Sequence, residues 1–205
     1  MADYKTIRGT STFEYEEKRS RFIATAAFAD TEEKALAVLN AVRAANRTAR
    51  HNVYAYVLQS GRARYSDDGE PAKTAGTPVL ETIGHAGVAD VIVVVTRYFG
   101  GILLGTGGLV RAYTQAAKLA LEAAPSGTMR VCVRLTVTVE YPLYERADLL
   151  LRTAGAHMEE PEFTHQVTLR CVLPQGEEAP LIPKLQEWSR GAAAIEVSPG
   201  FYTAF

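Results

Sequence analysis

The stretch VIVVVTRYFGGILLGTGGLVRAY, residues 91–113, joins a strand pattern, a glycine-rich loop and the start of a helix pattern. The run VIVVV is typical of a strand that is buried on both faces of a sheet. The segment from Thr106 to Ala124 has the spacing of an amphipathic helix. Because many phosphate-binding sites begin with a strand, a glycine-rich loop and a helix, this loop has to be compared with those motifs.

Neither nucleotide-binding motif is complete in this loop. Gly100 and Gly105 have the spacing of the first glycines of a P-loop, but Thr106 occupies the position where that motif needs a lysine. Gly105 and Gly107 begin a dinucleotide fingerprint that would require a glycine in place of Val110. The loop therefore predicts no ordinary nucleotide site.

The start of the following helix can still bind an anion, because its first N–H groups lack partners within the helix and the helix dipole is positive there. Gly105, Gly107 and Gly108 lie at this start, and Arg97 and Arg111 are close to it in the sequence. Glycine also lets a strand and a helix pass closely and accepts positive φ. The sequence leaves both interpretations open, an anion site and a purely structural junction.

Hydrophobic periodicity and turn residues predict the other elements of the first 125 residues. They are strands at 11–17, 20–29, 52–59, 63–66 and 90–97, and helices at 30–49, 77–87 and 106–124. Lys18 and Arg19 form a charged turn between the first two strands, and Asp30 with Glu33 fits a capping box. Thr77 is predicted to cap the helix that follows it.

The pattern starts again after residues 124–128, APSGT, which have the composition of a linker. The later elements are strands at 129–140, 165–174 and 193–198, helices at 142–155 and 178–191, and AHMEEPEF between the first helix and the second strand. Their order is the βαββαβ of a ferredoxin-like fold, so we expect an α+β protein with two domains, residues 1–125 and 130–205. The odd positions of the first strand are apolar, which assigns Cys132 to the polar, solvent-facing phase.

Composition is typical of a globular protein of the cytoplasm. The net charge is −1, and no N-terminal segment combines the basic and apolar regions of a signal peptide. The run VIVVV is too short to cross a bilayer. Cys132 and Cys171 are too few for a disulfide framework and are not spaced as metal ligands. The sequence therefore predicts a cytoplasmic protein with no membrane segment, no cofactor and no metal.

Residues 41–66 hold an excess of positive charge that the net charge hides. This segment contains Arg43, Arg47, Arg50, Arg62, Arg64 and His51, and it contains no acidic residue. Such a segment is typical of a surface that contacts nucleic acid or the ribosome. A solvated basic face without a ligand has the same composition, so both interpretations stand.

The loop SDDGEP, residues 66–71, concentrates three carboxylates. Asp67, Asp68 and Glu70 are close enough in sequence to hold a hard cation such as magnesium. Asp-Asp-Gly followed by Pro71 is also ordinary turn chemistry, and that interpretation accounts for every position of the loop.

Four blocks of the sequence resemble the IMPACT family in its bacterial, YigZ-like branch. They are RHNVYAY at 50–56, SDDGEPAKTAGTP at 66–78, GTPVLETIGHAGVADVIVVVTRYFGGILLG at 76–105 and GTGGLVRAY at 105–113. The resemblance implies an N-terminal domain with the ribosomal protein S5 domain 2-like fold and a C-terminal ferredoxin-like domain. It also implies a connection with translation, because two adjacent domains of elongation factor G have this pairing of folds and eukaryotic members of the family regulate translation through a protein partner. It supplies no catalytic residues.

These observations favour a non-enzymatic binding protein that contacts RNA or the ribosome through its first domain, with a protein of translation control as a further partner. The residues predicted to bind anions or nucleic acid are Arg97, Gly105, Gly107, Gly108, Arg111, Lys73, Arg50 and His51. One alternative is an enzyme acting on a phosphorylated small molecule, with Asp68 and Glu70 holding a cation. Another is a protein-interaction module whose glycines are structural. The second domain is not expected to be an RNA-recognition motif, since the polar phase of its central strands offers no aromatic residue.

Overall fold

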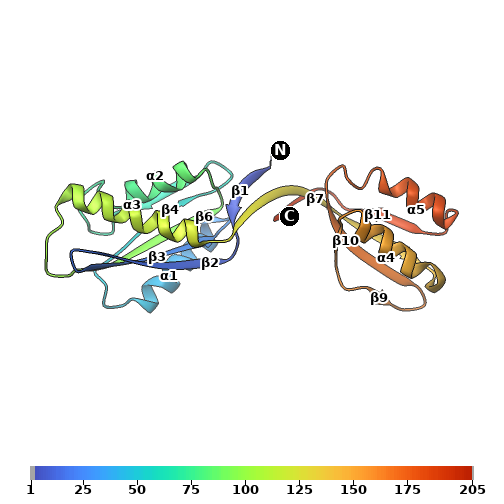
Figure 1. Ribbon diagram of the computed structural model, residues 1–205, viewed down its shortest axis with the longest axis horizontal. Coiled ribbons are helices and arrows are strands. Elements are labelled where there is room, and N and C mark those ends of the chain that lie inside the picture. The colour runs from blue at the N-terminus through green and yellow to red at the C-terminus, as the bar shows by residue number, and fades with distance from the viewer. Residues whose placement is uncertain (1–2, 205) are drawn as a thin grey trace. The chain divides into compact units, whose positions relative to one another are not determined.

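A computed structural model describes residues 3–204 and confirms the α+β class. The described chain divides into two compact units, residues 4–128 and residues 129–204 together with Asp3 (Figure 1). Each unit is built on an antiparallel sheet with helices packed against it.

The N-terminal unit has a five-stranded antiparallel sheet between two layers of helices. The strands in spatial order are β2 (Thr10–Glu17), β3 (Ser20–Phe28), β6 (Val91–Tyr98), β4 (His51–Val57) and β5 (Ala63–Ser66), and β1 (Tyr4–Ile7) precedes them. Helix α1 (Glu32–Ala45) packs on one face, and α2 (Gly76–Ala86) and α3 (Thr106–Ala123) pack on the other. Residues 91–97 of β6 are all buried, which confirms the prediction of a strand covered on both faces.

The two predicted helix caps in this unit are wrong by a few residues. Helix α1 is capped by Thr31, whose Oγ1 accepts a hydrogen bond from the Lys34 N–H at 3.2 Å, and not by Asp30. Helix α2 begins at Gly76, before Thr77, because Asp67 in the preceding loop supplies the cap. Oδ1 of Asp67 accepts hydrogen bonds from the N–H of Ala75 at 3.1 Å and from the N–H of Gly76 at 2.8 Å. A cap that comes from outside the helix leaves no signal in the helix sequence.

The loop between β6 and α3 needs glycine for a close approach. A Cβ at Gly100 would lie 2.0 Å from the carbonyl carbon and oxygen of Arg19, in the turn between β2 and β3. Gly101 and Gly105 have φ of 85° and 71°, which L side chains rarely adopt. These glycines therefore have the structural use that the sequence allowed.

The C-terminal unit is ferredoxin-like, as predicted. Its elements are β7 (Ser126–Val139), the 3-10 turn η1 (Tyr141–Leu143), α4 (Tyr144–Thr153), β8 (His157–Met158), β9 (Glu162–Phe163), β10 (Val167–Pro174), α5 (Leu181–Ser189), β11 (Ala194–Val197) and β12 (Phe201–Ala204). The sheet order β11-β7-β10-β8, with every neighbouring pair antiparallel, is that of a βαββαβ sandwich. Val167, Leu169, Cys171 and Leu173 share its buried face, as their spacing predicted.

Two expectations about β7 are wrong. Residues 126–128 were expected in a linker but belong to the strand, and the preceding Pro125 carbonyl accepts a hydrogen bond from the Arg8 N–H at 2.7 Å. Cys132 was expected to face solvent but is fully buried. At this position β7 pairs with both β12 and β10, opposite Phe201 and Pro174. Burial raises the pKa of the Cys132 thiol and thereby reduces its reactivity.

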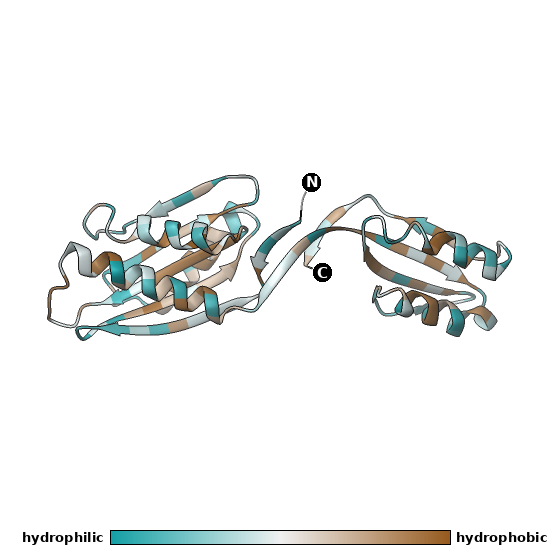
Figure 2. Cartoon of the chain, turned by 45° about the horizontal axis from the view of Figure 1, so that its top comes forward, coloured by the Kyte–Doolittle hydropathy of each residue, from teal (hydrophilic) through white to brown (hydrophobic). Residues whose placement is uncertain are grey.

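The helices are amphipathic, with hydrophobic and hydrophilic residues on opposite sides (Figure 2). Within residues 3–204, no helix combines the length and the apolar character that crossing a membrane requires. The loop from β6 to α3 is an exception to the polar character of surface loops, because Phe99, Ile102 and Leu103 are exposed there.

We predict that Gly100→Ala destabilises the N-terminal unit by about 1–3 kcal/mol. The added methyl group would overlap backbone atoms of Arg19 and Ser20, which can move only if the whole turn shifts. The matched control is Gly84→Ala in α2, where an added Cβ meets nothing within 4 Å. That change should stabilise the unit by up to about 1 kcal/mol, because alanine favours a helix. Thermal unfolding followed by circular dichroism measures both effects, and equal stability of the two variants would contradict the prediction.

Candidate functional site

Most of the residues that the sequence singles out lie at one end of the N-terminal sheet. The strand register places Tyr98 of β6 opposite Arg21 of β3, and Arg97 of β6 opposite His51 of β4. The loop from β5 to α2 joins the same end, because the carbonyl of Asp68 lies 2.8 Å from Nδ1 of His51. This end therefore contains the start of β4, the end of β6 and the loops that lead into α2 and α3.

A buried ion pair lies behind this end. The side chains of Arg97 and Glu70 are 8% and 4% exposed, and Nη1 of Arg97 donates to Oε1 of Glu70 at 2.7 Å. The hydroxyl of Tyr113 in α3 donates to the same oxygen at 2.8 Å. Burial, with the charge of Glu70, raises the pKa of Tyr113 far above its usual value, so the phenol remains protonated. Arg97, predicted to meet phosphate, is instead held by a carboxylate in the interior.

The guanidinium of Arg97 also lies between two aromatic rings. Its central carbon is 5.7 Å from the ring centroid of Phe22 and 5.7 Å from that of Phe99. Such contacts stabilise a buried cation. Its Nε is buried and has no hydrogen-bond partner among the described residues.

The acidic loop anchors its neighbours. Asp67 caps α2, as described above, and Asp68 accepts from Nη2 of Arg43 at 2.9 Å and from the Asn52 N–H at 2.7 Å. Glu70 is held by Arg97 and Tyr113. Asp68 and Glu70, the alternative cation ligands of the sequence analysis, thus each have a separate cationic partner. Residues 3–204 contain no group of three or more His, Cys, Asp or Glu side chains arranged for a metal ion.

Five exposed cations surround the site, and we call them the cationic rim. They are Lys18 and Arg19 in the turn between β2 and β3, Arg50 before β4, Lys73 before α2 and Arg111 in α3. No ion pair connects any of them to a carboxylate in the described part of the chain. Arg50, Lys73 and Arg111 were predicted as site residues from the sequence. Lys18 and Arg19 were not, although the charged turn that they form lies where it was expected.

Other arginines of the acid-free segment are neutralised by acids from elsewhere in the chain. Arg43 pairs with Asp68 at 2.9 Å, and Arg62 and Arg64 pair with Glu32 in α1 at 2.6 and 3.3 Å. Because Asp68 and Glu32 both lie outside residues 41–66, the excess of positive charge in that segment overstates the unpaired charge on the surface. Arg50 is one that stays unpaired.

The backbone of the cationic rim is unfavourable for its residues. Lys18, Arg19 and Lys73 have φ of 46°, 65° and 64°, in the left-handed region that non-glycine residues rarely occupy. Lys18 and Arg19 form a two-residue hairpin turn with positive φ at both positions, where Asn-Gly is the favoured sequence. A left-handed conformation costs a non-glycine residue roughly 1–2 kcal/mol. Residues kept against a local preference are typical of functional sites.

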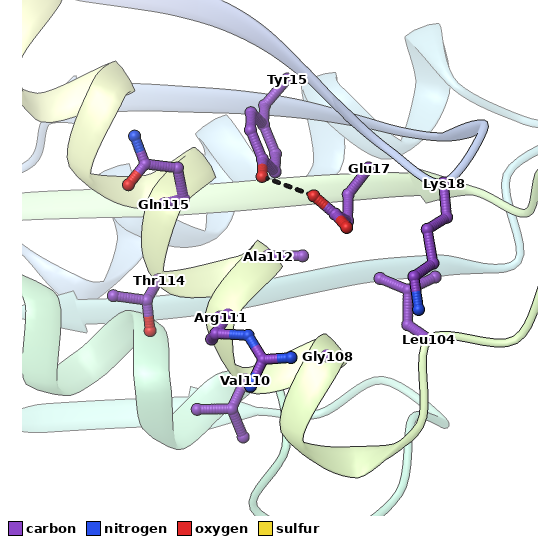
Figure 3. Close-up of a pocket in the computed structure, with 10 residues that line it drawn as sticks. All are labelled: Tyr15, Glu17, Lys18, Leu104, Gly108, Val110, Arg111, Ala112, Thr114 and Gln115. Atoms are coloured by element: carbon purple, nitrogen blue, oxygen red, sulfur yellow. Dashed lines mark hydrogen bonds between the residues drawn. The ribbon is translucent and has the colours of Figure 1, made fainter.

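The start of α3 opens into a pocket that Lys18 and Arg111 line together with Leu104 and Gly108 (Figure 3). The N-cap, Gly105, has no side chain to accept from the first N–H groups, and Gly107 is exposed beside it. The carboxylate of Glu17 also lines this pocket, where it accepts a hydrogen bond from the Tyr15 hydroxyl at 3.0 Å (Figure 3). Burial and Glu17 raise the pKa of Tyr15. The predicted helix start is therefore accessible and has two cations beside it.

A second pocket lies between the start of β4 and the loop after β6. Arg50, His51, Arg97, Phe99 and Leu103 line it, and its volume is about 620 Å³. Phe99 is 54% exposed. Phe99 was not among the predicted site residues. Its position directly after a buried strand and before two glycines is the sequence feature that could have indicated it. The structure thus gathers Arg50 and His51 at one pocket and Gly108 and Arg111 at another, with Lys73 in the loop that contacts His51.

The buried ion pair predicts that Glu70→Gln destabilises the N-terminal unit by about 3–5 kcal/mol, because Arg97 keeps its charge in the interior without a counter-charge. Glutamine retains a carbonyl oxygen for the Tyr113 hydroxyl, so the loss reports the charge. Glu32→Gln is the matched control, since Glu32 also accepts from a tyrosine and pairs with arginines, but with exposed ones. Calorimetric unfolding of both variants tests this, and similar losses for the two would contradict it.

Comparisons with known proteins agree with the architecture. Residues 18–121 match the family Impact N-terminal domain, and residues 137–192 match a domain of unknown function (DUF1949). An IMPACT family member of Thermus thermophilus is 42% identical over 87% of this chain and 98% of its own length. YigZ of Escherichia coli K12 is 38% identical over 87% of this chain and 89% of its own. A crystal structure of a hypothetical protein has a TM-score of 0.64 and 35% identity, and covers 95% of this chain and 97% of its own. The chain therefore belongs to the IMPACT family.

Proposed function

We propose that the N-terminal unit is a non-enzymatic RNA-binding module of the cytoplasm that acts in translation, with ribosomal RNA as its target. The observation that supports this most directly is the cationic rim, whose five side chains have no carboxylate partner among the described residues. Exposed cations of this kind neutralise phosphates and release condensed counterions, which provides most of the sequence-independent affinity for nucleic acid.

The arrangement of the rim fits a phosphate backbone better than a single small anion. Its members come from separate segments around one end of the sheet, the turn at Lys18 and Arg19, the loop at Lys73 and the helix at Arg111. The accessible start of α3 adds N–H groups to these charges. If all five cations contact single-stranded RNA, log K falls with log salt with a slope of about −3.5.

The alternative of an enzyme acting on a phosphorylated small molecule has less support. Such chemistry would need carboxylates free to hold a cation beside the phosphate. Asp68 is bound by Arg43 and the Asn52 N–H, and Glu70 by Arg97 and Tyr113. We therefore favour RNA binding over catalysis. We also favour it over a protein-interaction module, because the cationic rim indicates no specific protein partner.

Replacing the unfavourable turn separates RNA binding from stability. Lys18→Asn with Arg19→Gly should stabilise the unit by about 1–2 kcal/mol, because asparagine and glycine suit a turn with positive φ. The same variant should bind a labelled RNA oligonucleotide more weakly and reduce the salt slope by about 1.4, since two phosphate contacts are lost. Fluorescence anisotropy between about 50 and 200 mM salt measures the slope.

The matched control is Arg62→Ala with Arg64→Ala, which removes the same charge from side chains that are exposed but paired with Glu32. It should leave affinity nearly unchanged. Wild-type protein should also co-sediment with ribosomes at low salt. Binding that is insensitive to salt, or an equal loss in the control and the turn variant, would count against the rim as the RNA-binding surface.

A further inference from the structure

The second pocket differs from the rest of the cationic rim because it combines an aromatic ring with polar groups. Its volume of about 620 Å³ lies within the range of small-molecule sites. Phe99 and Leu103 form its apolar part and are 54% and 83% exposed. Arg50, His51 and Arg97 form its polar part.

The ring of Phe99 contacts the buried guanidinium of Arg97 and is also exposed to solvent. The guanidinium of Arg97 lies 5.7 Å from its centroid, and that guanidinium is fixed by Glu70 at 2.7 Å. More than half of the Phe99 side chain remains exposed, although the ring follows a strand whose preceding residues are buried. A ring that is oriented in advance and open on one side is a platform on which a flat group can stack.

The pocket also offers hydrogen-bonding groups for the edge of that flat group. The guanidinium groups of Arg50 and Arg97 line the pocket, and a guanidinium can only donate hydrogen bonds. His51 also lines the pocket, and its Nδ1 lies 2.8 Å from the carbonyl oxygen of Asp68, which can only accept, so Nδ1 carries a proton and the ring's one remaining acceptor position is Nε2. A donor and an acceptor at one aromatic platform match the mixed donor and acceptor edges of nucleobases.

We propose that this pocket receives one unstacked base of single-stranded RNA, with Phe99 as the stacking platform and Arg50 on the adjacent phosphate. The proposal rests on the proposed function and makes it specific, since the cationic rim alone would bind any phosphate backbone. In a duplex the bases are stacked and paired, so no base can enter the pocket. The protein therefore prefers single-stranded regions, such as loops and unpaired ends.

The test compares one RNA strand that has no internal pairing with the same strand annealed to its complement. Phe99→Ala should reduce affinity for the single strand about tenfold or more, because one stacked base is lost, and should leave affinity for the duplex unchanged. Phe13→Ala is the matched control, since Phe13 is also exposed, at 38%, but lies within β2 away from the pocket. Phe99→Trp should retain the preference, and stacking should quench its fluorescence when single-stranded RNA is added.

The outcomes distinguish this inference from the proposed function. If Phe99→Ala changes neither affinity, or lowers both equally, the base pocket is overturned, while the effect of Lys18→Asn with Arg19→Gly still reports on the cationic rim. If wild-type protein binds neither form of RNA, the proposed function itself fails. Because Phe99 is exposed, Phe99→Ala should melt within a few degrees of wild type, which excludes unfolding as the cause of a lost affinity.

Discussion

The buried contact between Arg97 and Glu70 is the interaction on which the functional end of the N-terminal unit depends. Taking both charges out of water is costly, and the pair is tolerated because the Tyr113 hydroxyl adds a second hydrogen bond to the same carboxylate oxygen. The pair joins the end of β6, the loop before α2 and the middle of α3. Each of these segments carries residues of the site. The pair therefore holds those residues in their relative positions.

The ion pair between Arg97 and Glu70 positions two groups at the surface, the loop that contains Asp68 and the ring of Phe99. Glu70 determines the position of the loop in which Asp68 binds His51, Asn52 and Arg43. Arg97 lies against the inner side of Phe99. A mostly buried ion pair thus orients groups that are exposed at the site. The arginines around this end divide in the same way, because Arg43 and Arg97 are paired with Asp68 and Glu70, whereas Arg19, Arg50 and Arg111 of the rim are in no ion pair of the described residues.

The sequence predicts the parts of this unit that depend on local pattern. The apolar run before Arg97, the helical spacing after Thr106 and the charged turn at Lys18 all appear where they were expected. Partners distant in the chain were not predictable, because periodicity describes the faces of one element and says nothing about what covers them. For this reason the sequence did not predict that Asp67 caps α2. It also did not predict the burial of Cys132, where β7 lies between the paired strands β12 and β10. Arg97 illustrates the difference most clearly, since its charge suggested phosphate and only the fold reveals Glu70.

The two units differ in the side chains around the central strands of their sheets. In the C-terminal sheet, Thr138 and Thr168 contact each other across the central strands at 3.3 Å, and Arg170 is paired with Glu162. β7 and β10 contain no aromatic residue, and Arg134 of β7 is paired with Glu159. In the N-terminal unit, the exposed ring of Phe99 shares a pocket with Arg50, which none of the ion pairs of the described residues includes. The turn at Lys18 and Arg19, which Gly100 approaches closely, has positive φ at both positions. Lys18 and Arg19 occupy a turn for which asparagine and glycine are better suited, and a role of their charges in binding would account for two residues that the backbone disfavours.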